Sequence, residues 1–358
     1  MGIEDDFRAV IENAVMRAAE QAGEEAVMRV LESGKLGAAI AESAPEIGAS
    51  VADGLVDRTP RLIVERRANE AGIAEAIRQA YGPGLDLCEG VVRSAHEIGE
   101  EYIDLSAPEG EDGVPVLRWV LGHLHARSCR IAEEALVLLR AGYGLGAYSR
   151  WRALHEVVVV GEFIKQSGDD TAARYYDHMA VNRWQLLKAA SESRRLDEHE
   201  LSALAQAQKR VDELVDVYGA EFLGDYGWAV KALSGQPDGG FRGIQAATDF
   251  THLRVDYREA SSAIHAVAVW VLEPPDAEHL GTTLVTGASP LVIATPAHAV
   301  ALSLLVSTGT LLTSSDSWAA PFLLSAISTL CDRTGDMLVA AEADVERRLR
   351  EEREIEQE

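Results

Sequence analysis

The sequence predicts an all-α protein, a multi-helix bundle with an N-terminal helical arm and a C-terminal helix pair. Apolar residues recur every three or four positions along most of the chain, which is the spacing of amphipathic helices. Alanine, leucine and valine dominate a composition with 47% hydrophobic but only 6% aromatic residues, which favours helices packed on helices. Only residues 282–286 (TTLVT) resemble a strand, and one short strand cannot form a sheet.

Residues 1–82 are predicted to form the helical arm. They include no obvious candidates for catalytic or binding residues. A first alanine-rich helix fits residues 7–31, where apolar residues keep the helical spacing. The sequence GASVADG at residues 48–54 predicts a break in the helical pattern. A second helix fits residues 62–81, and Gly82-Pro83-Gly84 is expected to end it.

Residues 83–275 predict the bundle core. Turns rich in glycine, proline or aspartate separate its helical segments, and short turns favour antiparallel neighbours. The segments with helical periodicity are residues 86–102, 114–139, 145–165, 171–191, 197–218 and 241–272.

Residues 276–345 predict the C-terminal helices that pack on the core, and residues 346–358 form a charged tail. The stretch 291–312 holds no charged residue and is nearly long enough to cross a bilayer. Pro296, His298, several hydroxyl side chains and the lack of a basic cluster at either end favour a buried helix pair instead. We therefore expect no membrane span.

Charge and cysteine content narrow the function classes. The formal net charge of −25 disfavours general binding to DNA or to another phosphate backbone. The three cysteines are far apart and lack a CxxC spacing, which indicates a reducing compartment. The acidic start MGIEDDFRAVIENA is not typical of a secretory signal, so we predict a cytoplasmic protein. The chain has no GxxxxGK[ST] loop, HExxH or GxSxG sequence, and we expect no cofactor.

A cluster of polar residues precedes the apolar run VVVV in the segment 145–165. Arg152 and Glu156 are four residues apart, so they lie on one helix face and can form an ion pair. Arg150 and His155 are five residues apart, about 140° around a helix, and converge only at a frayed helix start or across two chains.

A second polar stripe consists of Tyr257, Ser261 and His265, which recur every four residues before the apolar run AVAVWVL. Polar side chains on a buried helix need hydrogen-bonding partners, so these residues predict either a binding site or a cross-link between helices. His178 lies on the predicted helix 171–191, directly after the segment 145–165, and is expected near the polar residues of that segment.

Glu156, His178 and His265 have side chains of the types that bind metals. They do not show an ExxH pair or another recognised metal-ligand spacing. The sequence therefore predicts no metal site.

Several runs resemble a bacterial, largely helical family known as domain-of-unknown-function family 5677. These runs are AEEALVLLRAGYGLGAYSRWRALHE, ARYYDHMAVNRW, DYGWAVKAL and YREASSAIHA. The resemblance covers about residues 85–340, and its most specific parts are Arg152-x3-Glu156 and Ser261-x3-His265. It implies a helical fold and no established activity.

Arg150-x4-His155 is similar to the motif of HEPN-type ribonucleases, which occur in toxin and phage-defence systems. The resemblance implies that the arginine and histidine act without a metal on a ribose 2′-OH and the scissile phosphate, commonly across a dimer. Arginine offsets phosphate charge and histidine moves protons, as these roles require. Trp151 departs from the family, which usually has a polar side chain after the arginine.

Two hypotheses follow. The first is a helical binding or scaffold protein, in a bacterial stress or defence setting, whose polar cluster of Arg152, Glu156, His178, Tyr257 and Ser261 binds a partner or specifies the packing. The alternative is a metal-independent endoribonuclease with Arg150, His155 and His265 as catalytic residues and RNA as substrate. In both, alanine-rich apolar faces favour a homodimer.

Overall fold

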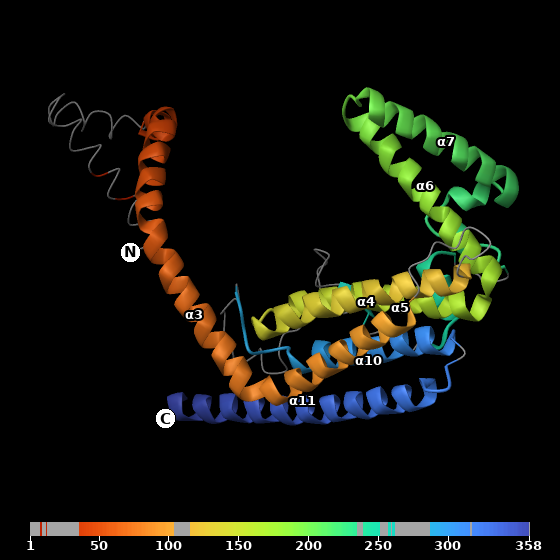
Figure 1. Ribbon diagram of the computed structural model, residues 1–358. Coiled ribbons are helices and arrows are strands. Elements are labelled where there is room, and N and C mark those ends of the chain that lie inside the picture. The colour runs from red at the N-terminus through yellow and green to blue at the C-terminus, as the bar shows by residue number, and fades with distance from the viewer. Residues whose placement is uncertain are drawn as a thin grey trace. The chain divides into compact units, whose positions relative to one another are not determined.

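The computed structural model describes residues 8, 12, 36–103, 115–234, 239–250, 257, 258, 260, 261, 287–315 and 317–357. All regular elements within these residues are α- or 3-10 helices, which confirms the all-α prediction (Figure 1). The candidate strand at residues 282–286 lies outside the described residues, as does most of the first predicted helix.

The described elements follow the predicted order closely from α4 onward. They are α3 (Leu36–Tyr102), α4 (Val116–Arg140), α5 (Gly144–Ser167), α6 (Asp169–Ser193), α7 (Glu198–Tyr218), η1 (Ala220–Leu223), η2 (Gly227–Ala229), α8 (Phe241–Ala246), α10 (Ala294–Thr313) and α11 (Ala320–Gln357). The chain divides into two compact units, residues 1–72 and 73–358. The domain boundaries expected at residues 82, 275 and 345 stay predictions.

Two expected helix breaks are wrong, because α3 runs through residues 48–54 and through Gly82-Pro83-Gly84 without interruption. Packing explains Gly84, since a Cβ at this position would lie 2.8 Å from Cδ2 of Leu338 in α11. This glycine allows two helices to approach closely rather than ending one of them. In the first unit, ion pairs one turn apart stabilise the exposed helix, as between Arg61 and Glu65 at 2.8 Å.

The expected helix over residues 241–272 is also wrong in part, because α8 ends at Ala246. The carbonyl oxygen of Gln245 at this helix end accepts from the hydroxyl of Thr248 at 3.0 Å and from the backbone N–H of Thr248 at 3.4 Å. Helical backbone is found again at Tyr257 and Arg258.

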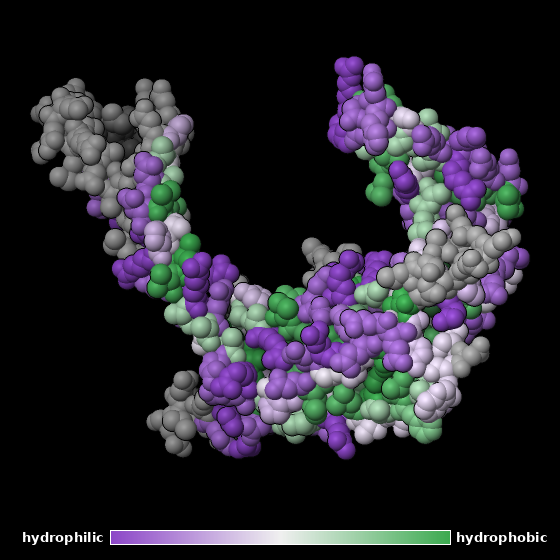
Figure 2. Space-filling model, in the orientation of Figure 1, coloured by the Kyte–Doolittle hydropathy of each residue, from purple (hydrophilic) through white to green (hydrophobic). Residues whose placement is uncertain are grey.

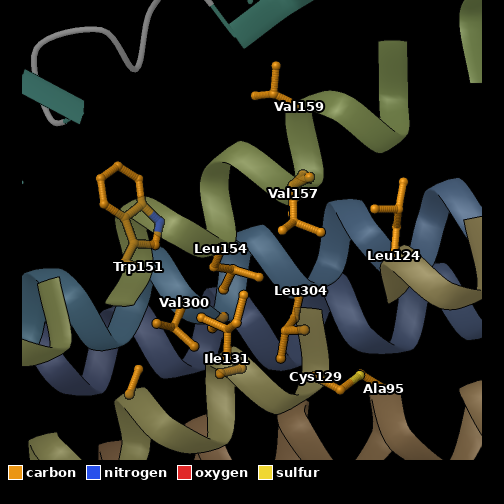
Figure 3. Close-up of a cluster of buried hydrophobic side chains, with 14 of the residues drawn as sticks. Ala95, Leu124, Cys129, Ile131, Trp151, Leu154, Val157, Val159, Val300 and Leu304 are labelled. Atoms are coloured by element: carbon orange, nitrogen blue, oxygen red, sulfur yellow. The ribbon is translucent and has the colours of Figure 1, made fainter. Parts of the chain in front are cut away.

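The second unit is a helical bundle in which α10 contacts α4, α5 and α11. Figure 3 shows Ile131 of α4, Leu154 of α5, and Val300 and Leu304 of α10 gathered in the core. The predicted C-terminal helix pair is confirmed as α10 and α11, which pack on each other. Over the face in Figure 2, hydrophilic side chains dominate α6 and α7, and hydrophobic patches alternate with hydrophilic ones over the bundle.

Helix α10 is the most apolar of the described helices, and it packs against α4, α5 and α11. Among the described helices it is the one long and apolar enough to cross a bilayer, and 61% of its most apolar stretch is buried within the protein. Its hydroxyl groups bind other helices: Ser303 accepts from the indole nitrogen of Trp151 at 3.0 Å, and Thr310 donates to Glu162 at 2.8 Å. These bonds join α10 to α5 at two levels.

His125 of α4 is buried between α3 and α10. Its Nε2 lies 3.0 Å from the carbonyl oxygen of Ala95, so this nitrogen donates, and Nδ1 accepts from the hydroxyl of Ser307 at 3.3 Å. Burial lowers the pKa of His125, because a charged ring would lose its hydration. The folded protein therefore holds this side chain neutral.

We expect acid to destabilise the fold partly through His125. As the pH falls below about 6.5, the unfolded chain binds a proton that the folded His125 does not, so the free energy of unfolding decreases. His125→Asn should lose less stability between pH 7 and pH 5 than the wild type in urea denaturation. His123→Asn, at an exposed position on the same helix, should keep the wild-type pH dependence. Equal slopes for both variants would contradict the assignment.

The start of α5 lies directly against the segment that precedes α10. Gly142 adopts a φ of +83°, and its carbonyl oxygen accepts a hydrogen bond from the backbone N–H of Ser289 at 2.8 Å. A Cβ on Gly144 would overlap the carbonyl oxygen of Val292. A Cβ on Gly146 would meet only ordinary van der Waals neighbours, the nearest at 3.6 Å.

Gly144→Ala should therefore lower the free energy of unfolding by about 2 kcal/mol or more, because backbone must move to admit the methyl group. Gly146→Ala is the matched control, and alanine's higher helix propensity should leave it neutral or up to about 1 kcal/mol more stable. Urea denaturation of both variants measures the difference. A Gly144→Ala variant as stable as Gly146→Ala would refute the close approach.

Candidate functional site

The polar residues at the centre of the site project from two adjacent faces of α5. Trp151 and His155 are four residues apart, share one face and are buried in the core. Arg152 and Glu156 lie one position further along the helix and are half-buried. The α5 sequence thus places two polar side chains at the edge of the core, where segments from later in the chain contact them.

Arg152 binds three side chains, and together they form the Arg152 cluster of Arg152, Glu156, Tyr257 and Ser261. Its guanidinium lies 2.9 Å from Oε1 of Glu156, which confirms the predicted ion pair. The same guanidinium donates to the hydroxyl of Tyr257 at 2.7 Å and to Oγ of Ser261 at 2.8 Å. The two predicted polar stripes, 105 to 109 residues apart in the chain, therefore meet at one arginine.

Tyr257 completes the cluster by donating its hydroxyl proton to Glu156. Burial raises the pKa of Tyr257, and the hydrogen bond to Glu156 raises it further, so the phenol stays protonated. The Arg152 guanidinium also lies over the Tyr257 ring, 4.8 Å from its centre. Ser261 donates to the carbonyl oxygen of Tyr257 at 2.7 Å, which holds both side chains on one turn.

His155 lies beneath the cluster, with an exposed fraction of 1%. Its Nε2 lies 3.1 Å from the amide nitrogen of Gln245 in α8, a partner that sequence reasoning did not identify. The rings of Trp151, Phe250 and Tyr257 surround it at centre distances of 5.4 to 6.1 Å. His155 is therefore enclosed by aromatic side chains and almost completely shielded from solvent.

Arg150 has a different environment from His155. Its guanidinium lies 2.5 Å from Oε2 of Glu134 in α4, with exposed side-chain fractions of 39% and 45%. The two residues of Arg150-x4-His155 thus contact different helices, α4 and α8. His265 lies outside the described residues. That Arg150, His155 and His265 catalyse a reaction stays a prediction.

His178 is buried on α6, where its Nε2 lies 2.9 Å from the carbonyl oxygen of Gly224 and its ring packs against Phe222. Burial lowers the pKa of His178. These partners belong to the segment around η1 rather than to the Arg152 cluster. Within the described residues, no group of three or more His, Cys, Asp or Glu side chains could hold a metal.

A groove of about 520 Å³ lies beside the cluster, between α5, α10 and α11, and we call it the α5–α10–α11 groove. Tyr148 and Trp151 line it from α5, and Phe250 adds a third aromatic ring. Its surface is mainly apolar, with His298 of α10 and Glu342 of α11 among the few polar side chains. No sequence motif indicated this groove, because its walls come from helices far apart in the chain.

The comparisons support the predicted family resemblance. Residues 118–269 match the model of a family of unknown function, DUF5677. The match is narrower than the resemblance at residues 85–340, but it spans the whole Arg152 cluster. The search of curated proteins found no match, and neither did the search of solved structures. The ribonuclease resemblance rests on Arg150 and His155 alone.

Because Arg152 and Arg150 have different environments, we expect their substitution to change the free energy of unfolding by different amounts. Arg152→Met keeps the aliphatic part of the side chain but leaves Glu156, Tyr257 and Ser261 without their shared donor. It should lower the free energy of unfolding by about 2 kcal/mol or more, as when one partner of a largely buried pair is removed. Chemical denaturation measures the change.

Arg150→Met is the matched control, with the same substitution on the same helix. Because the Arg150–Glu134 pair is solvent-exposed, its loss should cost less than about 1 kcal/mol. If Arg150→Met destabilised the protein as much as Arg152→Met, the Arg152 cluster would not be a special contributor to the packing.

Proposed function

We propose that the protein is a helical binding protein in which the Arg152 cluster fixes the packing and the α5–α10–α11 groove receives a small, largely apolar ligand. The observation that carries the proposal is the groove itself. Its volume of about 520 Å³ falls within the range of small-molecule sites, about 300–1,000 Å³. Aromatic and aliphatic side chains dominate its lining, as they do in such sites.

The contacts of Arg152 support a structural role for the cluster. Its Nε and Nη2 atoms bind Glu156, Tyr257 and Ser261 of the same chain. An arginine that binds three partners within its own chain joins the segments that carry them, and a ligand that took these same donors would have to displace those partners. The groove, on the neighbouring face of α5, needs no such displacement.

A saturable apolar probe tests the groove directly. Nile red, a neutral dye whose fluorescence increases in apolar surroundings, should bind the wild type at one site. Ala299→Trp adds an indole at a groove-lining position of α10 and should weaken binding about tenfold, because the side chain fills space the dye needs. Fluorescence titration measures the affinity.

Leu186→Trp is the control, since this residue of α6 is 74% exposed and does not line the groove. It should bind Nile red like the wild type, and thermal melts should show that both variants are folded. Undiminished binding by Ala299→Trp, or equal loss in both variants, would contradict a ligand site in the groove.

An RNA-cleavage assay separates this proposal from the ribonuclease alternative. With tRNA and structured RNA as substrates, the purified wild-type protein should show no cleavage, with or without EDTA. Cleavage that survives EDTA and is lost in both Arg150→Ala and His155→Ala, with unchanged thermal melts, would support the alternative and contradict a purely binding function.

A further inference from the structure

We infer that the ligand of the α5–α10–α11 groove is an organic ammonium ion with an apolar body, and that Glu342 binds its positive charge. This inference rests on the proposed function, because it names the chemical class of ligand for the same groove. The observation behind it is that the described groove lining contains a carboxylate but no lysine or arginine.

The described lining of the groove contains a carboxylate, Glu342, and one histidine, His298, but no lysine or arginine. Glu342 is half-buried and forms no ion pair within the part of the chain that the structure describes. The nearby basic residues Arg347 and Arg348 bind Asp344 instead.

The surroundings of Glu342 disfavour its negative charge. Burial raises the pKa of this carboxyl, and Glu346, one helical turn away, raises it further. The negative charges of Glu342 and Glu346 also act on Tyr81 of α3. Burial is the larger cause that raises the pKa of Tyr81, and the two carboxylates raise it further. A cation placed beside Glu342 would relieve this repulsion, whereas an anion would increase it.

The remaining lining suits the apolar part of such a ligand. The rings of Tyr148 and Trp151 stack at a centre distance of 5.2 Å, and both line the groove together with Phe250. Tyr148 and Trp151 are both 1% exposed, so the apolar surface that a ligand can reach comes from lining residues such as Leu302 and Val339, which are 41% and 64% exposed. The net charge of −25 also raises the local concentration of cations around the protein.

Three probes with the same tail test the charge preference: n-octylammonium, n-octanol and n-octanoate, titrated by calorimetry at pH 8. The wild type should bind octylammonium about fivefold more tightly than octanol, as a partly exposed ion pair would allow, and octanoate most weakly. Glu342→Gln should bind octylammonium and octanol equally and leave the affinity for octanol unchanged.

Glu351→Gln is the control, since this acid lies on the exposed end of α11 and does not line the groove. It should keep the wild-type preference, and a thermal melt should show that Glu342→Gln is folded. Equal binding of octanol and octylammonium by the wild type, or a preference that survives Glu342→Gln, would overturn the inference but leave the groove as a ligand site. No binding of any probe would contradict the proposed function as well.

Discussion

The enclosure of α10 by α4, α5 and α11 is the constraint on which the rest of the bundle depends. An uncharged helix of this length is stable in water only when its neighbours cover it. Its buried hydroxyls then need partners, and Ser303 and Ser307 find them in Trp151 and His125. These hydrogen bonds specify one register between α10 and its neighbours, which apolar contacts alone would leave less defined.

The position of the polar residues follows from that register. Trp151 is fixed by Ser303, and each further residue of α5 turns by about 100°. His155 therefore returns to the buried face, whereas Arg152 emerges at the edge of the core, where Tyr257 and Ser261 reach it. The cluster is a consequence of core packing, and it contributes to the packing in turn by joining the segment after α8 to α5.

Periodicity in the sequence predicted most of the described helices, because their apolar faces are continuous and face one core. The prediction of a helix end failed at Gly84. This glycine lies against Leu338, which is far away in the sequence and comes close only in the folded chain. Spacing likewise predicted the Arg152–Glu156 pair and the Tyr257–Ser261 stripe. It could not predict Gln245 as the partner of His155, or the groove, because these depend on how separate helices pack.

The same reasoning explains why a two-residue spacing says little about chemistry in this bundle. Five residues of helix turn Arg150 and His155 in directions about 140° apart, so Arg150 meets Glu134 and His155 meets Gln245. The charge of Arg150 is compensated by that ion pair, and the charge of Arg152 is compensated by Glu156. Among the described residues that line the groove, Glu342 has no lysine or arginine to compensate its charge, and a charge of this kind beside apolar surface favours a ligand of opposite charge.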